Sequence, residues 1–369
     1  MPPPPPKRRV LLLSGNLRYS GVMTWVLQLR AAFMALPEVD FALLVLSAPG
    51  TVCPTDRTFH TGRARSAWHL RLARWLQLHK CFSRAYAVAE MKEINKRVAG
   101  ILAQLGWLER VDVVIMVLGD KRPACLRGFP TIATIHSVLA PCHANSQEDA
   151  HIVAVGKTAA ERATQLGFSD VAVIYNPLDI EQTKQASNAY VPEISRPYLL
   201  FVGTLSCGKG IHELLQAFAL LEEDIDLVYV GPGSSQLDAL KQEARRLRVA
   251  DRVHFMGFQT NPMPWIRHAK LLVLPSKSEA MGYVAMEAVA LGCGIVVADF
   301  SAAEEFFMPE VIVAHMPEED FAPRLAARIS DGLSGKLPLG TKHGILESLN
   351  PETVARHYLA LAAKQALRE

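Results

Sequence analysis

The sequence lacks the features that mark several large classes of protein. Its six cysteines are scattered and form no CxxC pair, so neither a zinc site nor a disulfide framework is predicted. The apolar runs, such as 41–48 and 113–118, are strand-sized and well short of the roughly 20 residues that span a bilayer. The N-terminus has basic residues but only a four-residue apolar run, too short for a secretion signal. These absences predict a globular protein of the cytoplasm.

Nucleotide and metal motifs are also scarce. No GxGxxG follows the first apolar run, which argues against a dinucleotide cofactor, and no GxxxxGK[ST] is present, which excludes a Walker A loop. The letters DID at 224–226 match a metal-binding DxD pattern, but they lead into a strand far from the other motifs, so a chance match is the preferred interpretation. We therefore expect no cofactor and no required metal.

What is present indicates two α/β domains. A chain of 369 residues exceeds one ordinary core, and half of its residues are hydrophobic. Short apolar runs alternate with helical patterns, which predicts doubly wound parallel sheets, one in each half. The expected strands are Val10–Leu13, Phe41–Leu46, Val111–Leu118, Thr131–Ile135, Leu199–Val202, Leu227–Val230, Leu271–Leu274 and Ile295–Ala298.

The segment 179–197 separates the two halves. It has two prolines and no long apolar run, which is typical of a linker. We expect an N-terminal domain over 1–185 and a C-terminal domain over 186–349. Residues 350–369 should form a terminal helix that packs back toward the N-terminal domain, with Asn350 as its N-cap and Pro351 at its first position.

Two glutamates stand in the nearly apolar stretch SKSEAMGYVAMEAVALGCG, 276–294. A helix is expected over 279–291, after a buried strand, and would place Glu279 and Glu287 roughly 12 Å apart along its axis. Such a pair at the carboxyl edge of a sheet suits an elongated polar ligand. The alternative is that Ser276 and Glu279 form a capping box and that Glu287 is a solvated helix residue.

Two glycine-rich loops could bind phosphate. In LLFVGTLSCGKGIHELLQAF, 199–218, Lys209 lies at a strand-to-helix turn, where an ammonium and a helix N-terminus both favour an anion. The alternative is an ordinary surface lysine. In LLSGNLRYSGVMTWVLQLRAAF, 12–33, Gly15 and Gly21 would let a diphosphate approach the backbone.

Together these segments resemble the retaining nucleotide-sugar glycosyltransferases of the family 4 type, within the glycosyl transferases of group 1. The landmarks GNLRYSG, TIHS, FVGTLSCGKG and PSKSEAMGYVAME follow in the order of that family, as do VIYNPLD and DRVHFMGFQTNP. The resemblance covers nearly the whole chain. It implies the GT-B fold, in which two Rossmann-like domains face a central cleft.

The resemblance also implies roles for individual residues. Catalytic roles fall to Lys209 at the diphosphate, Glu279 at the donor sugar and His136 near the reacting sugar, although His136 could instead be a satisfied histidine at a strand end. Arg18 could contact a phosphate in place of the arginine that the family often has where this chain has Thr204. The remaining implied donor-binding residues are Gly15, Gly21, Gly203, Thr204, Gly257, Phe258, Met281, Gly282, Tyr283 and Glu287, with Glu287 at the ribose.

Three departures from the family pattern concern the donor site. Besides Thr204, the usual Glu-Gly-Phe-Gly reads Glu-Ala-Met-Gly from Glu279, and the common Gly-Gly turn reads Ser-Ala-Ala from Ser301. They affect the expected rate and donor fit rather than the fold.

The acceptor side is expected in the basic half of the chain. Residues 1–180 carry 21 lysines and arginines against 13 acidic residues, a balance of +8, whereas 181–369 carry 18 against 23, a balance of −5. The segment 57–89 has seven basic and no acidic residues along an apolar stripe, which suits an anionic membrane surface or, alternatively, an ordinary solvated helix. Nucleic acid is not expected, because no recognition motif accompanies the charge.

The resulting hypothesis is an enzyme that moves a hexose-type sugar from a nucleotide diphosphate donor, with UDP favoured, to a glycan or lipid-linked glycan such as lipopolysaccharide core. It would work in the cytoplasm or at the inner face of the plasma membrane. The alternatives are a GT-B epimerase or hydrolase of nucleotide sugars and a non-catalytic scaffold that binds them.

Overall fold

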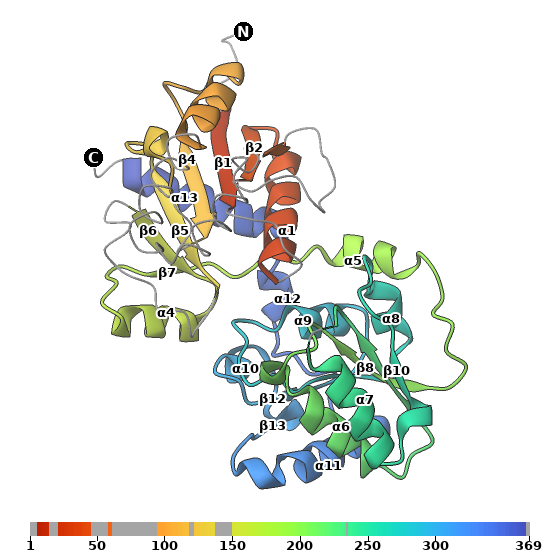
Figure 1. Ribbon diagram of the computed structural model, residues 1–369. Coiled ribbons are helices and arrows are strands. Elements are labelled where there is room, and N and C mark those ends of the chain that lie inside the picture. The colour runs from red at the N-terminus through yellow and green to blue at the C-terminus, as the bar shows by residue number, and fades with distance from the viewer. Residues whose placement is uncertain are drawn as a thin grey trace, which may run out of the picture.

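The structure is a computed structural model that describes residues 6–14, 21–45, 58–60, 94–117, 122–136, 150–233 and 235–366. Two α/β domains lie one above the other in Figure 1, the upper coloured from red to yellow-green apart from one blue helix near the C-terminus, and the lower mainly from green to blue. Each domain has its own parallel sheet. The alternation of apolar runs therefore predicted the architecture correctly, and all eight strands expected from the sequence are present.

The N-terminal sheet has seven strands in the order β3-β2-β1-β4-β5-β6-β7, all paired in parallel. Its elements are β1 (Arg8–Ser14), α1 (Gly21–Ala35), β2 (Val39–Val45), β3 (Thr58–His60), β4 (Val113–Val117), η1 (Ala124–Leu126), β5 (Thr131–Ile135), β6 (Ala150–Ala154), α4 (Lys157–Gln165) and β7 (Ala172–Val173), together with a helical segment at 94–104.

Strand β1 is apolar on both sides because helices cover both faces of the sheet. Val10 and Leu12 join the core formed with α1 and the C-terminal helix, whereas Leu11 and Leu13 join the core formed with the helical segment 94–104. A strand buried on both faces reads as a continuous apolar run, which is how it was recognised in the sequence.

The C-terminal sheet has six parallel strands in the order β10-β9-β8-β11-β12-β13. The strands are β8 (Tyr198–Val202), β9 (Asp226–Val230), β10 (Val253–Phe255), β11 (Leu271–Leu274), β12 (Ile295–Ala298) and β13 (Ile312–Val313). The helices are η3 (Cys207–Lys209), α6 (Ile211–Ala219), α7 (Leu237–Arg246), η4 (Ala250–Arg252), α8 (Met263–His268), α9 (Tyr283–Ala290), α10 (Ala303–Phe306), η5 (Pro309–Val311), η6 (Glu318–Asp320), α11 (Phe321–Leu333) and α12 (Ile345–Ser348).

The segment expected to be a linker begins instead with helix α5 (Ile180–Ser187), so the linker interpretation was wrong for this part. Asp179 caps the helix by accepting a hydrogen bond from the backbone N–H of Gln182 at 2.9 Å. Helix α5 packs against α8 and α9 of the C-terminal domain. The expected boundary between 185 and 186 lies inside α5, and the chain passes between the domains before this helix.

Helix α13 (Pro351–Ala366) returns the chain to the N-terminal domain, where it packs against α1 (Figure 1). Its start is confirmed as predicted, because the Asn350 side chain accepts a hydrogen bond from the Thr353 N–H at 3.1 Å. Tyr358 of α13 is fully buried in the core that α1 shares with β1. The chain crosses between the domains twice, before α5 and again before α13. The two crossings lie side by side, since the Leu178 N–H donates to the Leu349 carbonyl at 2.8 Å.

Within the described segments, no helix is both long and apolar enough to cross a membrane.

Candidate functional site

Loops gather at the carboxyl edge of the C-terminal sheet, because all of its strands are parallel. The backbones of Gly203 and Gly231, which follow β8 and β9, lie so close that a Cβ on Gly231 would overlap the Gly203 carbonyl. The Gly231 N–H in turn donates to the Gly257 carbonyl, after β10, at 2.8 Å. Three strand ends are thus joined through glycine backbone, which has no side chain at these three positions.

The loop after β8 packs directly on the end of β11. Gly210 has φ +65°, in the left-handed region that favours glycine, and a Cβ there would overlap the Pro275 carbonyl. The Lys277 N–H donates to the Gly208 carbonyl at 3.0 Å, which joins the two loops a second time. Lys209 lies between Gly208 and Gly210, two residues before the start of α6.

Lys209 and Glu279 form an ion pair. The distance from Lys209 Nζ to Glu279 Oε1 is 2.5 Å, and the side chains are 32% and 19% exposed. The two residues lie 70 positions apart in the sequence and meet because β8 and β11 are neighbours in the sheet. The residues that the sequence selected for phosphate and for sugar are therefore in contact, with one cation and one anion at the same edge.

Glu279 lies in a loop, so its expected helical position was wrong. Helix α9 begins at Tyr283, after Gly282 at φ +75°. The distance of roughly 12 Å estimated for two glutamates on one helix does not apply. The capping-box alternative is also wrong, because the Ser276 hydroxyl is fully buried and has no hydrogen-bond partner among the described residues.

Glu287 lies inside α9 and is partly buried. Burial raises the pKa of its carboxyl to about 8, so the group is largely protonated at neutral pH. It has no ion pair in the described part of the chain. Because its side chain is partly exposed, the alternative of a partly solvated helix residue stays open.

Tyr283 and Met281 flank the start of α9 in different ways. The Tyr283 hydroxyl donates to the Pro177 carbonyl at 2.6 Å, which connects α9 to the first crossing between the domains. Met281 is 2% exposed and packs in the apolar core, so its side chain does not line the edge. Thr204, Gly257 and Phe258 are exposed at the edge.

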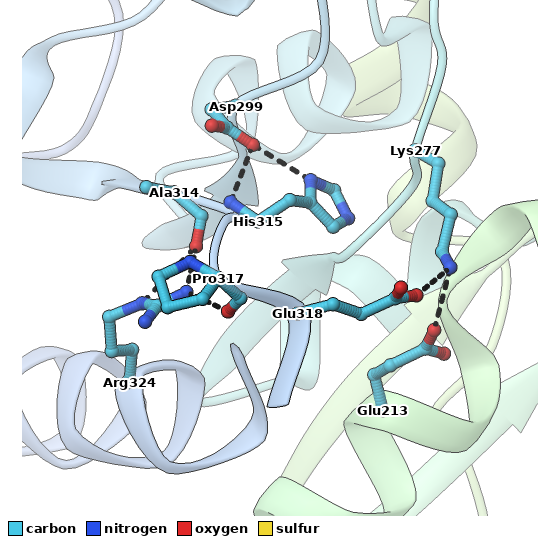
Figure 2. Close-up of polar contacts among 8 residues, drawn as sticks. All are labelled: Glu213, Lys277, Asp299, Ala314, His315, Pro317, Glu318 and Arg324. Atoms are coloured by element: carbon cyan, nitrogen blue, oxygen red, sulfur yellow. Dashed lines mark hydrogen bonds and ion pairs between the residues drawn. The ribbon is translucent and has the colours of Figure 1, made fainter. Parts of the chain in front are cut away.

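Lys277 fastens the loop that carries Glu279. Its Nζ lies 2.6 Å from Glu318 Oε1 in η6 and 3.3 Å from Glu213 Oε1 in α6 (Figure 2). The hydrogen bond with Glu318 raises the pKa of Lys277. No motif in the sequence marks Lys277, because its two partners come from distant segments.

Asp299 and His315 form a second pair at this edge, after β12 and β13. Asp299 Oδ1 lies 2.7 Å from His315 Nδ1 and accepts from the His315 backbone N–H at 2.8 Å (Figure 2). The imidazole stacks on Phe321 with ring centroids 4.2 Å apart. These contacts hold His315, three residues before Glu318, against the end of β12. They thereby help to position Glu318, the partner of Lys277.

His136 is the candidate from the N-terminal domain, at the end of β5. Its Nε2 lies 3.0 Å from the Thr134 hydroxyl, which itself donates to the Met116 carbonyl at 3.0 Å. Because that hydroxyl proton is already used, Nε2 carries the imidazole proton and Nδ1 is left as an acceptor. Burial lowers the pKa of His136 to about 3, and Trp25 packs edge-on against the ring. The histidine is therefore neutral.

The remaining candidate site residues either lie outside the described part of the chain or lie away from this edge. Gly15, Arg18 and most of the basic segment 57–89 lie outside the described residues. Gly21 is the first residue of α1. The Asp226 of the DID triplet is buried at the amino end of β9 and pairs with His254 at 2.8 Å and Arg196 at 3.4 Å. This aspartate has a structural role at the edge opposite Lys209.

A contact between the domains has no counterpart among the sequence motifs. Glu305 of α10 accepts hydrogen bonds from the backbone N–H of Lys157 at 2.8 Å and of Thr158 at 3.3 Å, at the start of α4. A Cβ on Gly156 would lie 3.1 Å from Glu305 Oε2. Burial, and then the contact with Glu305, raises the pKa of Tyr175 to about 12. The Ser-Ala-Ala turn drew attention to this region but not to Glu305.

Comparison with known proteins assigns this domain. Residues 182–338 match the model of the family Glycosyl transferases group 1. This part of the chain is a group 1 glycosyl transferase domain. The match covers β8 to α11, and thus includes Lys209, Glu279 and Glu287.

Two curated relatives align with parts of the chain. The N-acetylgalactosamine-N,N'-diacetylbacillosaminyl-diphospho-undecaprenol 4-alpha-N-acetylgalactosaminyltransferase of Campylobacter jejuni is 29% identical over 136 residues, 37% of this chain and 37% of that protein. The lipopolysaccharide core biosynthesis glycosyltransferase LpsE of Rhizobium meliloti is 27% identical over 213 residues, 56% of this chain and 62% of that protein. The chain thus spans less than two thirds of the length of either relative.

The fold as a whole matches solved structures. The apo form of the lipopolysaccharide outer core galactosyltransferase WaaB superimposes with a TM-score of 0.66 at 16% identity, covering 97% of this chain and 99% of that chain. The group 1 domain is thus one half of a two-domain GT-B fold, as the sequence predicted.

Proposed function

We propose that the protein is a glycosyltransferase that moves a hexose-type sugar from a nucleotide diphosphate to a glycan or lipid-linked glycan acceptor. The observation that carries the proposal is the Lys209–Glu279 pair, 2.5 Å apart at the carboxyl edge of the group 1 domain. A cation for the diphosphate and a carboxylate for sugar hydroxyls stand side by side, as a nucleotide sugar requires.

The chemistry follows from where charge develops. When the bond between the anomeric carbon and the diphosphate breaks, negative charge builds on the leaving phosphate and the sugar becomes oxocarbenium-like. The Lys209 ammonium would stabilise that phosphate more in the transition state than in the ground state. The glycine backbone around Gly203 and Gly231 would let the diphosphate approach closely.

Glu279 and His136 would hold the sugar. The carboxylate of Glu279 accepts hydrogen bonds from sugar hydroxyls, and the neutral His136 offers Nδ1 as a further acceptor. Half-buried, protonated Glu287 would bind the ribose through a hydroxyl that can donate as well as accept. No protein nucleophile is assigned. In the retaining reaction that the resemblance implies, the leaving phosphate takes the proton of the acceptor.

The acceptor and the donor base form the finer part of the proposal. The names of the two relatives refer to an undecaprenol-linked glycan and to lipopolysaccharide core, and the N-terminal half of this chain carries the basic excess that an anionic acceptor would favour. We therefore propose a lipopolysaccharide-type or polysaccharide acceptor, a cytoplasmic location at the inner membrane surface, and UDP as the nucleotide because it is common among similar enzymes.

The first experiment is a thermal-shift screen with UDP-, GDP- and ADP-sugars, since a ligand that binds the native state raises its apparent stability. The donor found in this way is then incubated with Lys209→Ala and Glu279→Ala, which should lose most transfer while unfolding at the wild-type temperature. Near wild-type turnover at saturating donor in either variant would refute the site assignment.

Two controls separate the competing functions. An epimerase or hydrolase would convert the donor without any acceptor, whereas a transferase needs both substrates. A non-catalytic scaffold would bind the nucleotide sugar and leave it unchanged with every acceptor tried. Flotation with liposomes, with and without anionic lipid, tests the membrane proposal, which fails if binding does not depend on lipid charge.

A further inference from the structure

The Lys209–Glu279 pair occupies the place at which a diphosphate would bind. Its Nζ–Oε1 distance is 2.5 Å, and both side chains are largely shielded from water, at 32% and 19% exposure. Shielding strengthens the attraction relative to an ion pair in bulk solvent. Among the described residues, Glu279 is the one anionic partner of Lys209.

The two loops that carry this pair are fastened to each other. Gly210 packs on the Pro275 carbonyl, and the Lys277 N–H donates to the Gly208 carbonyl at 3.0 Å. The side chain of Lys277 then ties the second loop to Glu213 and Glu318 (Figure 2). Because the backbones are held on both sides, Glu279 stays near Lys209, and a diphosphate that reaches the lysine meets the carboxylate there.

From this geometry we propose that Glu279 competes with the diphosphate for Lys209 and thereby weakens the binding of free nucleoside diphosphate relative to nucleotide sugar. The inference rests on the proposed function. A nucleotide sugar supplies hydroxyl donors that satisfy the carboxylate once it leaves the lysine. A free nucleoside diphosphate lacks that sugar, so its phosphates face an uncompensated like charge.

The consequence is a site that favours the donor over its own leaving group. After transfer, the sugar hydroxyls depart with the acceptor and the Glu279 carboxylate regains Lys209. The nucleoside diphosphate then loses its cationic partner and is released. Glu279 would thus set selectivity as well as hold the sugar.

The test is calorimetric titration of the full chain with UDP, GDP and ADP, none of which requires transfer. Glu279→Gln keeps the shape of the side chain and removes its charge. We expect the nucleoside diphosphate that binds the wild type best to bind this variant about tenfold more tightly, because one close like charge is gone. The matched control is Glu319→Gln, which removes an equal charge from an exposed position of the same domain and should change the affinity less than about twofold.

A double-mutant cycle tests the competition itself. In a Lys209→Gln background the carboxylate has no lysine to occupy, so adding Glu279→Gln should improve binding much less than it does in the wild type. A gain of equal size in both backgrounds would mean that the charge acts through space and not by competition.

The outcomes separate the two proposals. If the wild type binds a nucleoside diphosphate and Glu279→Gln binds it no more tightly, the inference is wrong while the donor site stands. If no nucleoside diphosphate or nucleotide sugar binds any variant, the proposed function fails and the inference fails with it.

Discussion

Replacing Glu287 by glutamine should stabilise the protein increasingly as the pH rises. Burial raises the pKa of this carboxyl from 4.5 to about 8 in the folded protein. Between these two values the folded state holds a proton that the unfolded state has lost. The wild type therefore loses stability with rising pH across this window, whereas the Glu287→Gln variant, whose amide cannot ionise, does not.

The magnitude follows from the two pKa values. Each pH unit inside the window corresponds to about 1.4 kcal/mol, and the loss levels off as the pH approaches the folded pKa. Between pH 6 and pH 8 the advantage of Glu287→Gln over the wild type should therefore grow by about 2 kcal/mol. For a domain of 150–250 residues this corresponds to roughly 4–8 °C in the midpoint of thermal unfolding.

Differential scanning fluorimetry of the ligand-free protein at half-unit pH steps measures this effect. Glu319→Gln is the matched control, because this glutamate of the same domain is exposed, and its difference from the wild type should stay flat with pH. A flat difference for Glu287→Gln as well would refute the assignment of a protonated Glu287. It would also remove the proposed donating hydroxyl from the ribose site.

Two further predictions concern the loops and the domain contact. Gly210→Ala should destabilise the C-terminal domain by more than about 2 kcal/mol and abolish donor binding, because alanine resists φ +65° and its Cβ would overlap the Pro275 carbonyl. Gly208→Ala is the control for both thermal and binding assays. It should have neither effect, because no atom lies within 4 Å of the added Cβ. Glu305→Ala should cost about 1 kcal/mol in thermal unfolding and speed limited proteolysis between the domains, because the first N–H groups of α4 lose their acceptor. Glu304→Ala, at an exposed neighbour, should match the wild type, and equal effects of the two glutamate variants would count against the contact.

The strands could be predicted because they are buried on both faces. Val10–Leu13 and Leu271–Leu274 read as unbroken apolar runs between helical patterns, which is what a covered parallel sheet produces. Shorter edge strands gave no such signal. The edge strand β10 (Val253–Phe255) has only three residues and is partly exposed, so periodicity alone could not identify it.

Two helix predictions failed, one at the start of α9 and one at α5. The stretch from 279 is rich in helix-forming residues, but Gly282 at φ +75° delays α9 until Tyr283 and leaves Glu279 in the loop. Similarly, helix α5 has a polar sequence and an Asp179 cap, and its contacts with α8 and α9 stabilise it more than its own composition does. Neither result could be read from the pattern, because each depends on the backbone conformation at one residue or on packing with distant helices.

The contact between Lys209 and Glu279 could not be predicted from the sequence. Each residue could be nominated separately, one for phosphate and one for sugar, because each follows a strand at the carboxyl edge. Their contact depends on β8 and β11 being neighbours, which is a property of the sheet order and not of either motif. A site assembled from two motifs can therefore have a property that neither motif has alone. Here that property is an ion pair that places one cation and one carboxylate 2.5 Å apart at a single edge of the sheet.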